Sequence, residues 1–243
     1  MAAAVPFDYL EWIYDLYGRD VNPLDVPEGV ALLRNFIDSS GVGIRSVCLN
    51  YFMDKLPVCC TDREREERLR EVALILGNAR AIGVKRAVLP FLDTSAIRNR
   101  DDFRALVELL TAAIPLAEES GVELHLESSL NPSEVARLLD LLPHGVLKIA
   151  YDSGNSASLG FTPAEEFSAY GERIGSVHIK DRMLHGATVP LGTGNADFKT
   201  LFVELERVNY RGDFTLEVAR GTPGDETAWA RKNLAFLRER WRN

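Results

Sequence analysis

Short apolar segments alternate with longer amphipathic segments seven times along this chain of 243 residues. The apolar segments have the length of ordinary β-strands. The segments between them carry helix signals, such as a cap residue followed by proline at Asn131-Pro132 and Thr162-Pro163. Strands and helices that alternate in this way form a parallel sheet. The expected strands are Phe7–Ile13, Ile44–Asn50, Lys85–Phe91, Val122–Glu127, Leu147–Asp152, Ser176–Lys180 and Phe214–Val218, and the expected helices are Glu28–Ser39, Arg63–Ile82, Asp102–Ser120, Pro132–Leu142, Pro163–Ile174, Phe198–Val208 and Glu226–Trp241.

The two faces of these strands favour a closed barrel over an open sheet. In the fourth strand Leu124 and Leu126 alternate with Glu123, His125 and Glu127, and the later strands alternate in the same way. Central strands of an open sheet are apolar on both faces, whereas a barrel strand can turn polar side chains inward near its end. No glycine-rich phosphate fingerprint follows the first strand, which disfavours a dinucleotide-binding fold. We therefore expect an α/β fold of the TIM-barrel type.

Composition and charge restrict the partners of this protein. Hydrophobic residues make up 46% of the chain, and no break in composition divides it, so we expect one domain over residues 1–243. The net charge of −8 argues against binding to nucleic acid or to an anionic membrane. The sequence has no basic leader and no apolar run of membrane-spanning length. The cysteines Cys48, Cys59 and Cys60 are too few for a disulfide framework, and we expect reduced thiols in a cytoplasmic protein.

Four potential metal ligands fall near the C-terminal ends of four consecutive expected strands. They are Glu127, Asp152, His178 and Glu217, and the alternation of side chains places all four on the inward face. Active sites of such barrels are built at that end. Three converging carboxylates would repel one another, and a divalent cation removes this repulsion. Carboxylate oxygens with one imidazole suit Mn²⁺, Mg²⁺ or Co²⁺. The alternative is a set of core polar residues that pair with one another.

Several segments of the chain resemble the xylose isomerase-like TIM-barrel superfamily. The segments that carry the resemblance are Val122–Ser128, Leu147–Gly160, Ser176–Phe198 and Tyr210–Val218. They look most like sugar and sugar-phosphate isomerases and epimerases of the L-ribulose-5-phosphate 3-epimerase and hexulose-phosphate epimerase kind. The resemblance implies one divalent ion, foremost Mn²⁺ with Mg²⁺, Co²⁺ or Zn²⁺ as alternatives, held by Glu127, Asp152, His178 and Glu217. It also implies that Glu127 and Glu217 act as the acid–base pair.

The start of the sequence departs from this family. The family's barrel begins with a strand and helix that would precede Phe7, and there is no room for them here. We therefore expect a barrel of seven parallel strands that lacks the first strand–helix unit. An open gap would expose strand edges. Either the chain is a shortened form, or its reading frame begins late, or a neighbouring subunit covers the gap in a homodimer.

The implied chemistry is the removal of a proton next to a carbonyl group, which leaves an enediolate. A divalent ion stabilises that charge, and two glutamates can remove a proton from one face and return one to the other. The outcome is epimerisation or aldose–ketose isomerisation of a small carbohydrate. Candidate substrate-binding residues are Glu11, Asn155, Lys180, Arg182 and His185. Ion pairs or a helix cap are the alternative roles of most of them.

Three other functions compete with this one. An apurinic endonuclease on the same scaffold would use many histidine ligands, whereas this chain has four histidines in all. A dehydratase of a keto-inositol or of dehydroshikimate begins with the same proton removal, and the sequence scarcely separates it from an epimerase. A catalytically inactive barrel with a binding role would have no chemical need for four donors on one face.

Overall fold

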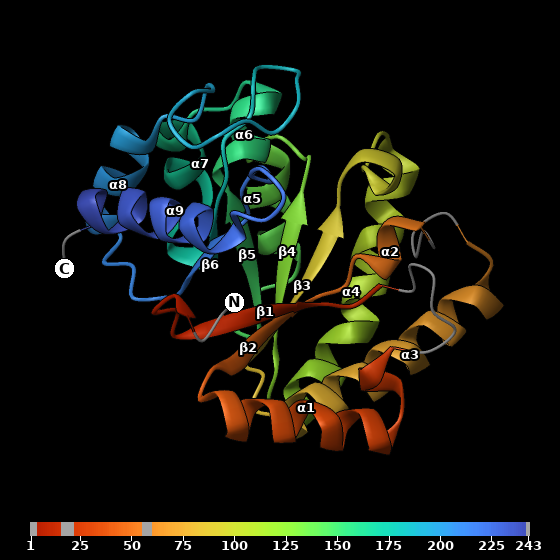
Figure 1. The fold of residues 1–243 in the computed structure, drawn as a ribbon. Coiled ribbons are helices and arrows are strands. Elements are labelled where there is room, and N and C mark those ends of the chain that lie inside the picture. Colours follow the sequence, from red (N-terminus) through yellow and green to blue (C-terminus); the bar gives the residue numbers. More distant parts are fainter. Residues whose placement is uncertain (1–3, 16–21, 55–59, 242–243) are drawn as a thin grey trace. The chain divides into compact units, whose positions relative to one another are not determined.

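The computed structural model describes residues 4–15, 22–54 and 60–241. In this part of the chain the strands follow one another in the sheet in chain order (Figure 1). The strands are β1 (Tyr9–Ile13), β2 (Gly43–Cys48), β3 (Arg86–Phe91), β4 (Glu123–Ser128), β5 (Leu147–Asp152), β6 (Ile174–Ile179) and β7 (Phe214–Leu216). The helices are α1 (Pro27–Ser40), α2 (Tyr51–Asp54), α3 (Asp62–Ala81), α4 (Arg100–Ser120), α5 (Pro132–Leu141), α6 (Ser153–Leu159), α7 (Pro163–Tyr170), α8 (Phe198–Arg207) and α9 (Glu226–Arg240).

Internal contacts divide the chain into two compact units. The N-terminal unit consists of Phe7–Leu130 and Arg137–Lys148, and the C-terminal unit consists of Met1–Pro6, Asn131–Ala136 and Ile149–Asn243. Each unit is described by itself below, and the single domain expected over residues 1–243 stays a prediction. None of the helices in the described ranges combines the length and the apolar character needed to cross a membrane.

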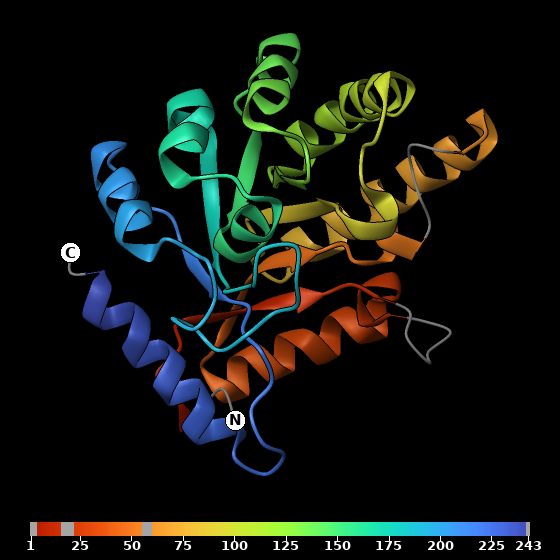
Figure 2. The same ribbon diagram turned by 90° about the horizontal axis from the view of Figure 1, so that it is seen from above.

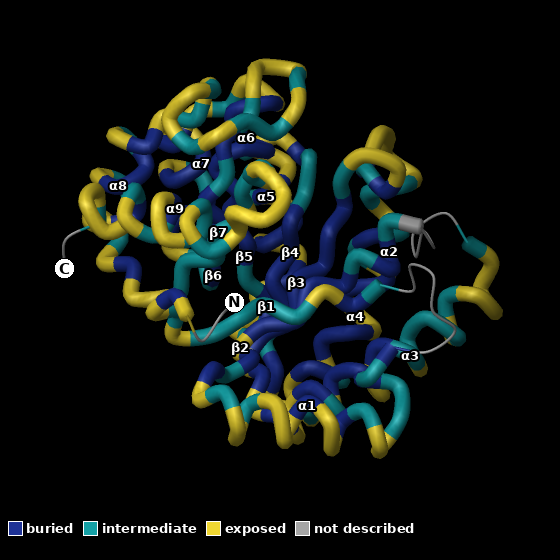
Figure 3. Tube along the Cα trace, viewed as in Figure 1, coloured by how far each residue is buried: buried dark blue, intermediate teal, exposed yellow. Residues whose placement is uncertain are grey.

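The N-terminal unit holds the parallel pairs β1–β2, β2–β3 and β3–β4, with α1, α3 and α4 along one face of these strands (Figure 2). Helix α4 begins at the cap Asn99, whose side chain accepts two backbone N–H bonds, and ends at Gly121 in the left-handed conformation. Its fully buried side chains Leu106, Leu110 and Ile114 recur at helical spacing and pack toward the strands. Strands β3 and β4 are mostly buried, β1 is only partly buried, and the outer helix turns are exposed (Figure 3).

The C-terminal unit holds the parallel pairs β5–β6 and β6–β7, with α7, α8 and α9 along one face. Helix α7 begins with proline after Thr162, which forms a capping box with Glu165. An aromatic cluster of Phe198, Phe202 and Phe214 joins α8 to β7. These contacts hold the start of β7, and Glu217 directly follows its last residue, Leu216.

The expected elements are all present, with shifts at their ends. Helix α7 ends at Tyr170 instead of Ile174, because a short 3₁₀ turn (Gly171–Arg173) leads directly into β6. Strand β7 ends at Leu216, so Glu217 lies just beyond the strand and not within it. The short helices α2 and α6 were not expected. Cys48 is buried and Cys60 is partly buried, whereas Cys59 lies outside the described residues.

Candidate metal centre

Asp152 is the last residue of β5 and the N-cap of α6. Its Oδ1 accepts the backbone N–H of Asn155 at 2.6 Å, which fixes one side of the carboxylate. The next residue, Ser153, ties this corner to the end of β6: its Oγ accepts the N–H of Lys180 at 3.0 Å and lies 2.7 Å from the Lys180 carbonyl oxygen. The start of α6 therefore holds Asp152 and the residues after β6 in a fixed relation.

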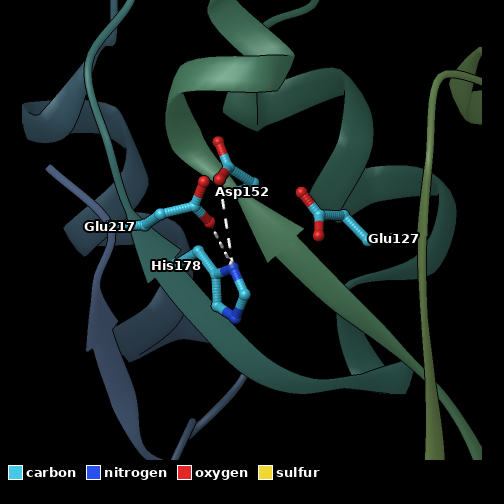
Figure 4. Close-up of side chains that lie close together, drawn as sticks. All are labelled: Glu127, Asp152, His178 and Glu217. Carbon is cyan, nitrogen blue, oxygen red and sulfur yellow. Dashed lines mark hydrogen bonds and ion pairs between the residues drawn. The ribbon is translucent and has the colours of Figure 1, made fainter. Parts of the chain in front are cut away.

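His178 lies one residue before the end of β6, directly opposite Asp152 in the strand pairing, and it is fully buried. Its Nδ1 lies 3.1 Å from Glu217 Oε2 and 4.0 Å from Asp152 Oδ2. Figure 4 shows both carboxylates turned toward the imidazole ring. The Glu217 backbone donates to the Ile179 carbonyl at 3.1 Å, which continues the β6–β7 ladder by one residue. The three side chains thus meet at the C-terminal ends of β5, β6 and β7.

Lys180 brings a positive charge to the same place. Its Nζ is hydrogen-bonded to Glu217 Oε1 and lies 3.8 Å from Asp152 Oδ2. The Lys180 side chain is 12% exposed, whereas that of Glu217 is 46% exposed. The cluster is therefore open to solvent on the Glu217 side and closed around Asp152 and His178.

The two carboxyl groups differ in their acidity. Burial raises the pKa of Asp152 to about 6, and the charge of Lys180 offsets only part of that rise. Burial also raises the pKa of Glu217, but the hydrogen bond from His178 and the charge of Lys180 outweigh it and bring that pKa to about 2. Glu217 is thus ionised at neutral pH, and ionised Asp152 needs further positive charge nearby.

The donors of this cluster fit a divalent cation. Ligand atoms of Asp152, His178 and Glu217 lie within 4.8 Å of one another. Asp152 Oδ2 is buried, and within the described part of the chain it accepts no hydrogen bond. A buried carboxylate oxygen in that state is costly unless a cation compensates it. Two carboxylates and one imidazole are ligands of Mn²⁺, Mg²⁺ and Zn²⁺ in proteins. These three residues form a candidate metal-binding group.

Two further site residues from the sequence belong to the N-terminal unit. Glu127 is the penultimate residue of β4 and is 5% exposed. Glu11 lies in β1, opposite Ser46 of β2. Figure 4 also labels Glu127, whose role as a ligand and as a member of the acid–base pair stays a prediction, as does contact of Glu11 with substrate.

Of the remaining candidates, Asn155 and Arg182 are joined to each other. Arg182 Nη1 donates to Asn155 Oδ1 at 2.8 Å, and Arg182 Nε donates to the Gly186 carbonyl at 3.0 Å. Because the backbone N–H of Asn155 donates to Asp152 Oδ1, this pair is linked directly to the cluster. The exposed His185 lies on the same loop in a left-handed conformation, and its N–H is bonded to the Ser158 carbonyl. Substrate contacts of all three stay predictions.

The loop after β6 is held by the fully buried carboxylate of Asp181. This carboxylate accepts three backbone N–H bonds, from Gly192 and Gly194 at 2.9 Å and from Ala196 at 3.0 Å. A Cβ atom on Gly194 would lie 2.3 Å from Asp181 Oδ1, so glycine is required for this close approach. The loop that carries Arg182 and His185 is thus tied to Asp181, near the start of the loop.

The sequence alone did not single out Glu166, a residue of α7 whose carboxylate is hydrogen-bonded to Ser156 of α6. Glu166 is 5% exposed and accepts hydrogen bonds from Ser156 and from the Tyr170 hydroxyl, the latter at 2.7 Å. Burial raises its pKa, and the hydrogen bonds from Ser156 and Tyr170 offset part of that rise. Its position between Pro163 and Tyr170 on the buried face of α7 was the signal available in the sequence.

Comparisons with known proteins agree with this fold. The model of the family described as xylose isomerase-like TIM barrel matches residues 1–240. A putative L-ribulose-5-phosphate 3-epimerase, SgbU, of Escherichia coli K12 is 27% identical over 234 residues, which cover 90% of this chain and 81% of that protein. An inosose dehydratase of Clostridium perfringens (strain ATCC 13124) is 28% identical over 152 residues, which cover 53% of this chain and 51% of that protein.

A similar solved structure is that of D-allulose 3-epimerase from Methylomonas sp. in complex with D-allulose. It superposes with a TM-score of 0.75 at 21% identity and covers 99% of this chain and 88% of that one. A likeness at this identity concerns the fold. Together with the family model it confirms the expected α/β fold of the TIM-barrel type.

Proposed function

The chain belongs to the xylose isomerase-like TIM barrel family, and on that premise we propose that it is a divalent-metal-dependent isomerase or epimerase of a sugar or sugar phosphate. The observation that carries the proposal is the meeting of Asp152, His178 and Glu217 at the C-terminal ends of three successive strands. That end of the strands is where barrel enzymes of this type carry their chemistry. The name of the E. coli relative supports the choice of an epimerase.

Four residues would hold the ion: Glu127, Asp152, His178 and Glu217. Glu127 is included for two reasons. It is the penultimate residue of β4, as His178 is of β6, and its carboxylate is buried. When bound, the ion supplies positive charge that stabilises the negative charge on the substrate oxygens. We propose Mn²⁺ as the native ion, because the donors are mostly carboxylate oxygens.

Glu217 and Glu127 would transfer the proton. Glu217 is suited to act as the base because its partly exposed carboxylate is ionised and accessible to a substrate carbon. Glu127 would return a proton on the opposite face of that carbon, or at the neighbouring carbon in an isomerisation. Which glutamate acts as base depends on the configuration of the substrate.

The substrate would be a small carbohydrate held by polar groups around the cluster. Arg182 and Asn155 are suited to bind its hydroxyl or phosphate oxygens, since their side chains are already fixed to each other. Lys180, His185 and Glu11 are the further proposed contacts. We also propose, from the sequence, that the enzyme works in the cytoplasm and forms a homodimer.

The test is a panel of ketoses and ketose phosphates incubated with the protein and Mn²⁺ in heavy water. We expect deuterium to enter one substrate at the carbon next to the carbonyl group. Glu127→Gln and Glu217→Gln should each abolish this exchange, and Glu172→Gln, outside the cluster, should leave it unchanged. Exchange that persists in both active-site variants would refute the acid–base roles.

A second candidate function is dehydration of a keto-inositol. It is favoured by the relatives named inosose dehydratase, and it begins with the same proton removal. In that case a keto-inositol substrate would lose one water molecule, and mass spectrometry would detect a product lighter than the substrate by that mass. Loss of water without epimerisation of any ketose would assign the chain to the dehydratases.

A further inference from the structure

The ammonium group of Lys180 lies against two of the carboxylates that would bind the metal. It is hydrogen-bonded to Glu217 Oε1 and stands 3.8 Å from Asp152 Oδ2. The same two carboxylates also lie near His178 Nδ1, that of Glu217 at 3.1 Å and that of Asp152 at 4.0 Å. Lys180 therefore supplies to the proposed ligands the positive charge that a metal ion would otherwise supply.

The path of the Lys180 side chain is set by the residues around it. Ser153 Oγ accepts the Lys180 N–H and lies 2.7 Å from the Lys180 carbonyl oxygen, which fixes the backbone. Gly154 leaves room for the aliphatic stem, because a Cβ atom at that position would lie 2.7 Å from Lys180 Cγ. With only 12% of the side chain exposed, the ammonium group is directed into the cluster and not into solvent.

A divalent ion and the Lys180 ammonium group cannot both bind Asp152 and Glu217 as tightly as either would alone. A divalent ion bound to Asp152 and Glu217 would stand a few ångströms from the ammonium group, and repulsion between like charges is strong where few waters screen it. We infer that Lys180 is an internal counter-ion, which holds the ligand carboxylates together before the ion binds and is displaced when it binds. The inference rests on the proposed metal site and assigns a role to a residue outside the ligand set.

Displacement couples ion binding to the position of Lys180. The ion must break the contacts of Lys180 with Glu217 and Asp152, so the lysine lowers the affinity for the ion. Removal of the positive charge should raise that affinity, by about 5- to 150-fold if the coupling has an ordinary size. Before the ion binds, the same removal should destabilise the protein, since two neighbouring carboxylates lose their shared partner.

The first experiment compares Mn²⁺ binding to the wild type, Lys180→Met and the control Lys199→Met by isothermal titration calorimetry. Lys199 is exposed on α8, so its loss changes the net charge equally without touching the cluster. We expect Lys180→Met alone to bind Mn²⁺ more tightly, and to melt at a lower temperature than the wild type in the presence of a chelator. Equal or weaker binding by Lys180→Met overturns the inference while the metal site stands.

A second experiment uses the wild type and does not depend on the variant folding. Reductive methylation of lysine amines, read by peptide mass spectrometry, reports how accessible each ammonium group is. Saturating Mn²⁺ should increase the labelling of Lys180 severalfold and leave Lys199 unchanged. Unchanged or reduced labelling of Lys180 with Mn²⁺ bound refutes displacement. A wild type that binds no divalent ion at all refutes the metal site itself, and with it this inference.

Discussion

Asp152 and His178 stand opposite each other in the parallel pairing of β5 with β6, and 4.0 Å separates Asp152 Oδ2 from His178 Nδ1. The other oxygen of the carboxylate, Oδ1, caps α6 by accepting the N–H of Asn155. One oxygen thus supports the backbone, and the other faces the imidazole ring. A substitution can remove the charge of this group while the cap is kept.

Asp152→Asn is that substitution, because an asparagine side chain also caps helices. We expect the variant to remain folded and to bind Mn²⁺ at least about 100-fold more weakly, since even residues that only support a ligand contribute up to that factor. Calorimetry and circular dichroism measure the two properties. Asp197→Asn, at the cap of α8, is the matched control and should bind Mn²⁺ like the wild type. An unchanged affinity in Asp152→Asn would place the ion elsewhere.

The carboxylate of Asp181 should determine the order of the loop after β6. Asp181→Ala removes the acceptor of three backbone N–H groups and should cost about 2 kcal/mol of stability. Hydrogen exchange of residues 182–196 should then become faster, and the loop should no longer hold Arg182 against Asn155. The control Asp197→Ala loses a cap bond worth about 1 kcal/mol and should leave loop exchange unchanged. Slow loop exchange in Asp181→Ala would contradict the role.

Alternation along the strands was enough to predict which residues of the C-terminal unit meet. Asp152 and His178 were placed on one face by counting in twos, and the pairing of β5 with β6 sets them side by side. The same rule applied to β7 reached Glu217 although the strand ends earlier, because its backbone continues the ladder. His125, which precedes Glu127 by two residues on β4, is fully buried, and its Nε2 lies 3.0 Å from Glu123 Oε2.

Other features depend on tertiary contacts that the alternation of polar and apolar residues along the sequence does not reveal. Helix α6 was missed because serine, glycine and asparagine at its start favour loops, and it forms because Asp152 caps it and Glu166 supports it. From the sequence alone, Gly192 and Gly194 fit either an ordinary turn or a cradle for an anion. The anion is Asp181 of the same chain. The Lys180 side chain can take its direction because glycine at position 154 has no Cβ atom, and this close packing is visible only in the structure.

Glu166 should make the protein less stable as the pH rises. Burial raises its pKa above the ordinary 4.5, so the folded state holds its proton more tightly than the unfolded state does. Stability from this group is complete below pH 4.5 and is lost as the pH rises through the folded pKa. Relative to Glu166→Gln, the wild type should therefore lose free energy of unfolding above pH 4.5, as urea titrations at several pH values measure. A difference that does not change with pH would contradict the raised pKa, and Glu165→Gln is the control.

Glu123 should make the protein more stable as the pH rises, which is the opposite of the effect of Glu166. His125 Nε2 and Lys148 Nζ lie 3.0 and 2.6 Å from its two carboxylate oxygens. Burial raises the pKa of Glu123, but these two hydrogen bonds outweigh it and bring the pKa to about 2. The folded state therefore binds this proton more weakly than the unfolded state, so the stability is present above pH 4.5 and is lost as the pH falls toward 2.

The Glu123 side chain is 38% exposed, so solvent screens much of the effect, and we expect about 1 kcal/mol. Urea unfolding at pH 7 should show Glu123→Gln to be less stable than the wild type by that amount. At pH 3 the difference should shrink, because the unfolded wild type then binds a proton that the folded wild type, with its Glu123 pKa of about 2, still largely excludes. Glu67→Gln, in an exposed pair with Arg63, should differ little from the wild type at either pH. A difference between Glu123→Gln and the wild type that is equal at both pH values would show that the charge of Glu123 contributes nothing.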